Sequence, residues 1–394
     1  MTVDDRPPLR IALFTEVFLP KTDGVVTSIA RTLDELRERG HEVLVVAPSG
    51  AVPSYAGFPV YRVPAFALRP WYPELSVGLP VPSVARRVEA FEPDLVHAVS
   101  PIALAANGVV IANRLELPLV ASYHTDLPKY AKDLGLKAFS KPGEKWLKWL
   151  HSQADVNLCP SEQTIADAQR LGFPRVGKWP GGVDTDLFCP ERASDEMRER
   201  LTDGHPDAPL ILSVGRVSKE KNLDSLAPVL DRLPGARIAF VGGGPHEDDL
   251  KELFAGRPAA FTGPLSGLEL ATAFASSDVF VFPSKTDTLG LVSLEAQSSG
   301  VPVVGARAGG IPATIADGES GFLVDPDDPD DVAGRLQQLI DDPMLRAAMG
   351  AEARENALQY SWEAATDVLV DAYWRAIRRR GHANRVEEKR RSGH

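Results

Sequence analysis

Short runs of Val, Ile, Leu and Phe alternate with amphipathic helical patterns along almost the whole chain. In the first half, the runs that predict strands are Arg10–Phe14, Glu42–Val46, Leu95–Ala98 and Leu119–Ser122, and the first amphipathic stretch predicts a helix over Gly24–Arg39. Continuous apolar strands separated by helices are typical of parallel sheets that are covered on both faces. The first half therefore predicts a doubly wound α/β domain.

The same alternation restarts in the second half. Strands are predicted at Pro209–Val214, Arg237–Val241, Ala260–Thr262 and Val279–Pro283, with helices at about 222–233, 246–254, 267–276, 290–299, 343–358 and 361–380. The polar stretch from Asp184 to Asp207 is the predicted seam. We expect two Rossmann-like domains, residues 1–187 and 188–359, with a helix over about 360–380 that rejoins the first and a basic tail over 381–394.

Composition narrows the class of protein. The 394 residues carry a net charge of −11, which argues against a broad basic surface for nucleic acid. There is no apolar run of about 18 residues and no secretory pattern at the N-terminus, so we expect a cytoplasmic protein. The two cysteines, Cys159 and Cys189, are expected to be reduced thiols.

Cations and glycines follow the predicted strands, where ligands bind in open α/β sheets. Gly215, Arg216 and Lys221 come after the strand 209–214, and three glycines around Gly243 come after the strand 237–241. An Arg fork, a mobile Lys and close backbone approach suit a diphosphate. Gly24 precedes a helix whose first N–H groups favour an anion. Solvated surface cations and ordinary tight turns are the alternative interpretations.

Two acids flank the helix that follows the strand 279–283. Asp287 lies in the loop, and Glu295 lies eight positions later, about two turns on and near the same face. Ionised carboxylates accept hydrogen bonds from vicinal hydroxyls of a sugar. Gly290 and Leu291, at the expected helix start, belong to the same predicted site. The alternative is a capping Asp followed by an ordinary Glu.

Taken together, these motifs resemble retaining glycosyltransferase family 4, over about residues 9 to 375. The residues that carry the resemblance are G-R at 215–216, E-K at 220–221, GGGP at 242–245, the acids at 287 and 295, SGVPVVGARAGGIP at 299–312 and G-V-D at 182–184. The resemblance implies a GT-B fold, in which two domains face a cleft. It also implies that the protein is an enzyme that uses a nucleotide-sugar donor.

The resemblance also implies roles for particular residues. Arg216 and Lys221 would hold the donor diphosphate, Glu295 the ribose and Asp287 the donor sugar. Gly24 would let its loop approach the diphosphate. His124, in SYHTD, would contact the sugar near its anomeric carbon; from the sequence alone, a structural histidine is the alternative. Family members usually have Glu at the position of Asp287, which affects the expected donor contact.

Within the family, IALFTEVFLPKTDGVVT, WYPELSVGLP and ASYHTDLPKY are most similar to sulfolipid synthases, which transfer sulfoquinovose from its UDP form to diacylglycerol. GDP-mannose-dependent mannosyltransferases acting on glycolipids are similar too. For the sulfonate, Lys21, Lys285 and Arg307 are the candidate cations. A nucleotide-sugar 2-epimerase and a non-catalytic nucleotide-sugar sensor are more distant alternatives. The oligomeric state stays open.

No His/Cys spacing suits zinc, and the D-x-D motifs do not follow buried strands, so we expect no cofactor and no metal. Residues 129–151 contain six lysines and two acids, with interleaved aromatic residues. Lys145, Trp146 and Trp149 in this stretch are candidates for contact with a membrane or a lipid acceptor, on the cytoplasmic membrane face. A helix with a solvated lysine face is the alternative.

Overall fold

The computed structural model describes residues 6–21, 23–68, 72–124 and 137–381. The chain divides into two compact units, which are described separately below. Unit 1 comprises Met1–Pro180 and Trp362–His394, and unit 2 comprises Gly181–Ser361. The division thus falls seven residues before the boundary expected from the sequence, and residues 181–187 lie in unit 2.

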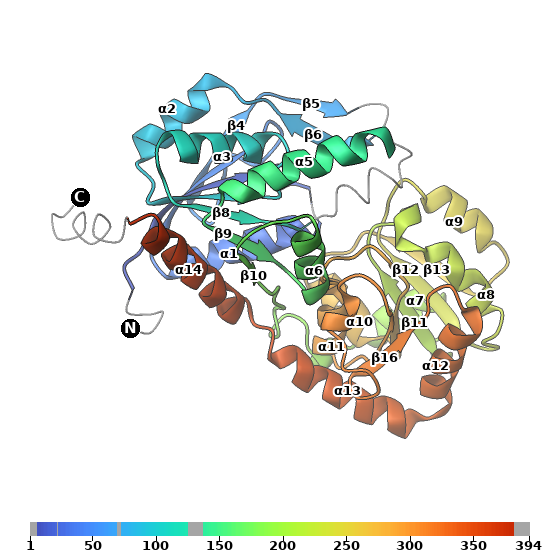
Figure 1. The fold of residues 1–394 in the computed structure, drawn as a ribbon. Helices are drawn as coiled ribbons and strands as arrows, with labels where there is room; N and C mark the ends of the chain where they lie inside the picture. The colour runs from blue at the N-terminus through green and yellow to red at the C-terminus, as the bar shows by residue number, and fades with distance from the viewer. Residues whose placement is uncertain (1–5, 22, 69–71, 125–136, 382–394) are drawn as a thin grey trace. The chain divides into compact units, whose positions relative to one another are not determined.

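Unit 1 contains an eight-stranded sheet in the order β10-β9-β8-β7-β1-β2-β4-β3, in which all neighbours are parallel except β3 and β4 (Figure 1). Its strands are β1 (Arg10–Thr15), β2 (Glu42–Pro48), β3 (Ser54–Tyr55), β4 (Phe58–Val63), β7 (Leu95–Val99), β8 (Leu119–Ser122), β9 (Val156–Cys159) and β10 (Val176–Lys178). A separate antiparallel pair consists of β5 (Ala65–Leu68) and β6 (Tyr72–Gly78).

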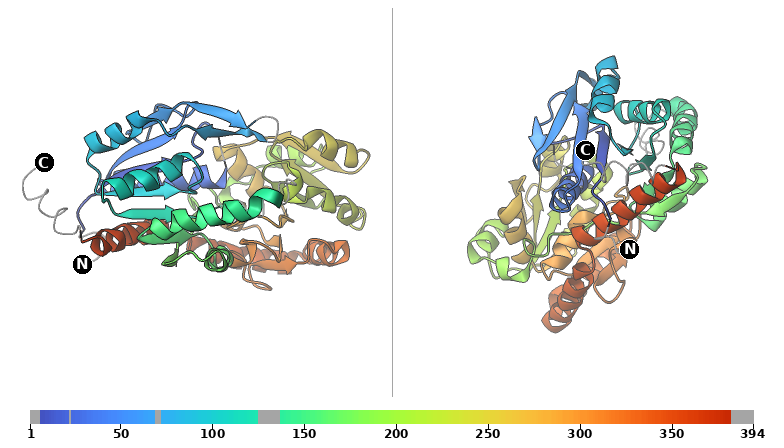
Figure 2. Two further views of the ribbon diagram at one scale, coloured as in Figure 1. Left: turned by 45° about the horizontal axis from the view of Figure 1, so that its top comes forward. Right: turned by 90° about the vertical axis from the view of Figure 1, so that its left-hand side faces the viewer.

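Helices cover both faces of this sheet because successive strand residues point to opposite sides. Ile11 and Leu13 pack in the same cluster as α1 (Gly24–Glu38) and α14 (Trp362–Arg379). Phe14 packs with α2 (Pro82–Phe91), α3 (Leu104–Arg114) and the C-terminal end of α5 (Lys137–Gln153). A further helix among the described residues of this unit is α6 (Glu162–Arg170). Figure 1 shows α2, α3 and α5 in the upper part of unit 1 and α14 in its lower part, and Figure 2 shows the same elements from two further directions.

Unit 2 contains a six-stranded parallel sheet in the order β13-β12-β11-β14-β15-β16. Its strands are β11 (Leu210–Val214), β12 (Arg237–Val241), β13 (Ala259–Gly263), β14 (Val279–Phe282), β15 (Val303–Ala306) and β16 (Gly321–Val324). Ile211 faces one apolar cluster, and Leu210 and Leu212 face another, so this sheet is also buried on both sides. The doubly wound α/β class expected from the sequence is confirmed.

The helices of unit 2 are α7 (Asp195–Leu201), α8 (Leu226–Leu230), α9 (Glu247–Leu253), α10 (Gly267–Ala275), α11 (Leu291–Ser298), α12 (Pro329–Asp341) and α13 (Pro343–Leu358). Short 3-10 turns are η2 (Pro190–Arg192), η3 (Lys219–Lys221), η4 (Leu223–Ser225) and η5 (Ile311–Ala313). The helix predicted over 222–233 is therefore wrong in its first part. Asn222 adopts a left-handed conformation, with φ 58°, between η3 and η4, and the α-helix begins only at Leu226.

The order of strands places a topological switch point in each sheet. In unit 2 the chain runs outward from β11 to β13 and then returns to β14 on the other side of β11. In unit 1 it runs outward from β1 through β2 and then returns to β7 on the other side of β1. Ligands of open α/β sheets bind beyond the carboxyl ends of the strands at such points. The switch points therefore direct attention to the loops after β11 and β14, and after β1 and β7.

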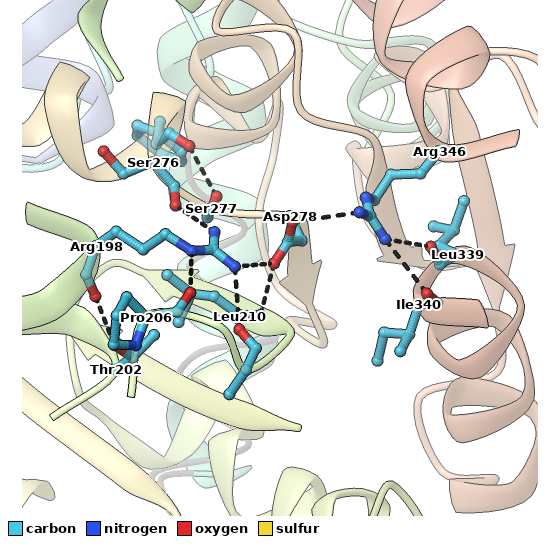
Figure 3. Close-up of polar contacts among 12 residues, drawn as sticks. Arg198, Thr202, Pro206, Leu210, Ser276, Ser277, Asp278, Leu339, Ile340 and Arg346 are labelled. Atoms are coloured by element: carbon cyan, nitrogen blue, oxygen red, sulfur yellow. Dashed lines mark hydrogen bonds and ion pairs between the residues drawn. The ribbon is translucent and has the colours of Figure 1, made fainter. Parts of the chain in front are cut away.

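The amino edge of the unit 2 sheet is held by a cluster of ion pairs (Figure 3). The Asp278 carboxylate accepts hydrogen bonds from Leu210 N and from Arg198, both at 2.8 Å, and Arg346 lies 3.6 Å away. Arg198 belongs to α7 and also donates to the carbonyl of Ser276. The segment 184–207, expected from the sequence to be a polar seam, is therefore anchored in unit 2 and does not link the units.

Both cysteines are free thiols; Cys159 is buried, and burial together with the charge of Asp167 raises its pKa to about 12. Across the part of the chain that the structure describes, no helix combines the length and apolar character needed to cross a bilayer.

Candidate functional site

The turns after β11 and β12 interlock through their backbones. Gly215 N donates to Val241 O at 2.9 Å, and Val217 N donates to Gly243 O at 3.0 Å. A Cβ at Gly242 would lie 1.9 Å from the carbonyl oxygen of Gly215, and φ is 139° and 145° at these two glycines. Only glycine fits such a backbone approach. Gly243 is less crowded, since a Cβ there would first meet Glu247 at 3.3 Å.

The loop after β14 is clamped from the neighbouring β15 side. Gly310 N donates to Asp287 O at 2.7 Å, and a Cβ at Gly310 would lie 1.9 Å from Thr288 O. A Cβ at Gly309 would lie 2.4 Å from Asp287 O. These two glycines lie within SGVPVVGARAGGIP, the stretch at 299–312 that carries the family resemblance, and no role was predicted for either of them. Together they fix the backbone from which Asp287 extends.

Lys221 and Asp287 meet at the switch point of unit 2. Lys221 Nζ donates to Asp287 Oδ1 at 2.9 Å and to Oδ2 at 2.8 Å, and the two side chains are about one-fifth exposed, at 23% and 20%. Because the turn after β11 and the loop after β14 lie side by side, residues 66 positions apart form an ion pair. The structure excludes the interpretation of Asp287 as a helix cap: α11 begins at Leu291, and its N-cap is Gly290, with φ 79°.

The remaining predicted residues of this region are Arg216 and Glu295. Arg216 is half-buried beside Glu220, whose carboxylate accepts a hydrogen bond from Ser218 Oγ at 2.6 Å. Burial raises the pKa of the Glu220 carboxyl, but the Ser218 and backbone hydrogen bonds and the charges of Arg216 and Lys221 outweigh it and lower the pKa. Glu295 is half-buried in the second turn of α11. No side chain caps α11, so no side chain accepts a capping hydrogen bond from the N–H groups at its start, which lie at the carboxyl edge of the unit 2 sheet.

The corresponding edge of unit 1 is organised differently. Glu16, directly after β1, is buried, and its carboxylate accepts hydrogen bonds at 2.7–3.1 Å from four consecutive N–H groups, Ile102 to Ala105. These groups form the start of α3. At Gly24, the start of α1 receives the Asp23 carboxylate, which accepts from Val26 N at 2.8 Å. An acidic side chain of the protein therefore occupies each helix start. Glu16 was not predicted, because nothing near it in the chain marks its role.

His124 follows β8 and is buried in an aromatic pocket. Its ring packs edge-on against Trp179, with 5.3 Å between ring centroids, and Trp179 in turn packs against His97. His97 contacts Tyr373 Oη at 2.9 Å and Ser122 Oγ at 3.1 Å. Burial lowers the pKa of His124 to about 4, and burial with the charge of His124 lowers that of His97 to about 3. His124 Nε2 is buried and has no hydrogen-bond partner among the described residues.

The aromatic residues of α5 present a mixed surface. Leu147 and Leu150 are buried, whereas Trp146 and Trp149 are each 44% exposed and their rings stack at 5.2 Å. Trp146 Nε1 donates to Ile102 O at 3.0 Å, at the start of α3. Lys145 is exposed one residue before Trp146. The basic stretch therefore forms an amphipathic helix from residue 137 onward, while positions 129–136 lie outside the described residues.

The acidic motifs and two of the three candidate sulfonate cations have partners within the protein. Lys285 pairs with Asp327, and Arg307 donates to Asp317 at 2.8 Å. Asp328 caps α12 by accepting from Asp330 N and Asp331 N, and Asp184 accepts from Leu187 N in a turn. The described residues contain no group of three potential metal ligands. Lys21 is exposed in unit 1.

The comparisons with known sequences agree over most of the chain. A family model described as Glycosyltransferase Family 4 matches residues 22–187, and one described as Glycosyl transferases group 1 matches residues 197–356. The chain is 42% identical over 378 residues to a sulfoquinovosyl transferase of Arabidopsis thaliana, covering 94% of this chain and 74% of the relative. It is 35% identical over 380 residues to a GDP-mannose-dependent alpha-mannosyltransferase of Mycolicibacterium smegmatis, covering 94% and 99%.

Solved structures share the fold at low sequence identity. A sucrose-phosphate synthase from Thermosynechococcus elongatus is similar with a TM-score of 0.76 and 20% identity, covering 93% of this chain and 98% of that one. The Anabaena protein HepE in complex with UDP and glucose is similar with a TM-score of 0.73 and 19% identity, covering 92% and 98%.

Proposed function

The chain belongs to glycosyltransferase family 4, with a GT-B fold, and on that premise we propose that it transfers a sugar from a nucleoside diphosphate to a lipid, with retention of configuration. The observation that carries the donor half of the proposal is the switch point of unit 2. There, Arg216, Lys221 and the uncapped start of α11 gather at the carboxyl ends of β11 and β14. A diphosphate suits two cations and free N–H groups.

The roles we propose are those that the family resemblance implies, and the placement of the unit 2 residues supports theirs. Arg216 and Lys221 hold the diphosphate, Glu295 accepts from the ribose hydroxyls, and Asp287 accepts from the donor sugar. Gly215, Gly243, Gly290 and Leu291 supply backbone at close range. On unit 1, His124 contacts the sugar as a neutral imidazole, because its pKa of about 4 lies well below neutral pH. Gly24 brings its loop near the diphosphate.

In the proposed reaction, the acceptor hydroxyl attacks the anomeric carbon on the face that the diphosphate leaves. The departing phosphate oxygen takes the acceptor proton, so no protein nucleophile is required. The protein contributes charge stabilisation on the leaving group through Arg216, Lys221 and the α11 dipole, and removing one such donor typically costs about 3–4 kcal/mol of transition-state stabilisation. Transfer is expected to proceed without a metal or another cofactor.

The donor we propose is UDP-sulfoquinovose, with diacylglycerol as acceptor. The support is the 42% identity to the sulfoquinovosyl transferase, compared with 33–35% for three GDP-mannose-dependent mannosyltransferases. Those relatives make mannose transfer from GDP-mannose to a glycolipid the second candidate. Asp287 favours neither, because its carboxylate is shorter than the usual Glu in either case.

A lipid acceptor requires access to a membrane, and we propose that α5 provides it. Trp149 is exposed and stacked on Trp146, with Lys145 and Lys148 exposed beside them. Exposed tryptophans with neighbouring lysines are typical of helices that bind anionic membrane surfaces. The proposed site of action is the cytoplasmic face of a membrane.

One experiment tests both halves. Purified protein is incubated with anionic vesicles containing diacylglycerol and, in parallel, UDP-sulfoquinovose, UDP-glucose or GDP-mannose, with EDTA, and the lipids are analysed by mass spectrometry. A sulfoquinovosyl lipid is the expected product; a mannosyl lipid would replace the donor assignment, and no glycolipid from any donor contradicts the proposal. Trp149→Ser should reduce the vesicle-bound fraction, whereas the control Leu268→Ser, at an exposed apolar position of unit 2, should not.

A further inference from the structure

The charges at the unit 2 switch point are already matched within the protein. Lys221 binds both carboxylate oxygens of Asp287, and Arg216 lies close enough to Glu220 to lower the pKa of its carboxyl. With Glu295 and with Asp327, which pairs with Lys285, the region holds four cations and four acids, all on residues of the fully described unit 2: Arg216, Lys219, Lys221 and Lys285 against Glu220, Asp287, Glu295 and Asp327. A region proposed to receive a diphosphate therefore carries no surplus of positive charge before the donor arrives.

From this geometry we propose that Asp287 is an internal competitor of the donor diphosphate, which occupies the Lys221 ammonium in the free protein and takes it back when the nucleoside diphosphate leaves. The proposal rests on the proposed function and adds a product-release role to Asp287. An ammonium is a compact charge with three donors, and both shortest contacts of Lys221 go to one carboxylate. A phosphate that approaches the same nitrogen meets the like charge of Asp287.

The backbone around Asp287 keeps its carboxylate in a position to compete for Lys221. Its backbone is held by the Gly310 N–H and by the close approach of Gly309, so the carboxylate stays near Lys221 whether or not the ammonium is engaged elsewhere. When the diphosphate binds Lys221, the freed carboxylate oxygens become available to the hydroxyls of the donor sugar. When the sugar has been transferred, that second partner is gone, and the carboxylate again competes for Lys221. The nucleoside diphosphate product is thereby bound less tightly than the intact donor.

The test measures binding of UDP, GDP and inorganic pyrophosphate by calorimetry at low ionic strength. Asp287→Asn keeps the size of the side chain and removes its charge, so it should bind each of these about tenfold more tightly than the wild type, the order expected from deleting one nearby like charge. UDP or GDP should dissociate correspondingly more slowly, and product inhibition should strengthen while kcat falls. Asp287→Glu restores the carboxylate and should return affinity to the wild-type level.

A double-mutant cycle separates this mechanism from a general change of the loop. In a Lys221→Met background, Asp287→Asn should no longer raise affinity, because the shared ammonium is absent. Equal or weaker binding by Asp287→Asn than by the wild type, or a gain that persists in Lys221→Met, overturns the proposal. If wild type and variant both bind none of the three probes, the proposed function falls with it; normal wild-type binding and transfer without the gain overturns the competition alone. Thermal unfolding of each variant confirms that it is folded.

Discussion

The two sheets of this protein differ in what binds the helix N–H groups at their switch points. In unit 1, the N–H groups at the start of α3 are bound by the buried carboxylate of Glu16, four hydrogen bonds to one side chain. In unit 2, the start of α11 has no capping side chain, and the nearby charges are an ion pair about one-fifth exposed, Lys221 with Asp287. One edge is held by a buried carboxylate at a helix start, and the other by an ion pair with no side chain on the helix start.

The difference bears on the donor site proposed for unit 2. A helix start that already holds a buried carboxylate must give up charge-assisted hydrogen bonds before it can accept another anion. An edge whose charges form a single, partly exposed ion pair exchanges partners more readily, because fewer hydrogen bonds must be given up. The fold alone offers two candidate anion sites; the side chains leave one of them available.

The largest expected effect concerns acidification of unit 1. Burial lowers the pKa of His97 to about 3 and those of His124 and His151 to about 4, below the ordinary value of 6.5. The unfolded chain therefore binds more protons, so the stability these groups contribute is complete above about pH 6.5 and is lost as the pH falls towards 4. The loss is roughly 1 kcal/mol per pH unit for each histidine.

Hydrogen exchange followed by mass spectrometry at pH 7.0 and 5.5, corrected for the intrinsic rates, checks this prediction. Slow amides of β7, β8 and α14, the elements around His97, should lose protection on acidification. All three histidines lie in unit 1, so a loss confined to the slow amides of β11 and β14 would contradict the assignment.

The second effect concerns the glycine clamp of unit 2. In Gly310→Ala, the new methyl group would lie 1.9 Å from Thr288 O, so the loop that carries Asp287 must move. We expect about 3 kcal/mol of destabilisation and loss of nucleoside diphosphate binding, measured by chemical unfolding and calorimetry. The matched control is Gly334→Ala in α12, where no atom lies within 4 Å of the added Cβ and helix propensity favours alanine. Unchanged binding in Gly310→Ala would show that the clamp does not position Asp287.

The sequence predicted the fold because its signal is local. Continuous apolar runs identified β1, β2, β7 and β8 in unit 1 and β11 to β14 in unit 2. Strands β3 to β6, β9, β10, β15 and β16 were not predicted. Most of them have four residues or fewer, and such short runs resemble loops or helix ends. The predicted helix over 222–233 failed for a local reason too: the left-handed Asn222 interrupts it.

The candidate site also contains residues with a local sequence signal and residues without one. Arg216 and Lys221 could be proposed because they lie in the turn that follows a buried strand. The partners could not: Lys221 and Asp287 are 66 residues apart, and Glu16 contacts N–H groups 86 to 89 positions away. The helical spacing that linked Asp287 to Glu295 was only partly valid, because α11 begins at Leu291 and Asp287 lies in the preceding loop. Pairing between distant loops follows from strand order, which the alternating pattern alone does not encode.

The smallest expected effect tests the comparison most directly. Glu16→Gln retains the shape of the side chain but removes the charge from the acceptor of four N–H groups, so unit 1 should lose about 2 kcal/mol in urea unfolding at pH 7. Glu42→Gln is the control. The Glu42 side chain is 61% exposed, and its ion pair with Arg10, at 3.4 Å, lies at the surface, so this variant should change stability by less than about 0.5 kcal/mol. If the start of α3 is an anion site filled from within, sulfate should restore part of the stability of a Glu16→Ala variant and should do so more than for the wild type. Equal stabilisation of both proteins by sulfate would mean that Glu16 serves only to cap the helix, and that the contrast between the two switch points lies in their exposure alone.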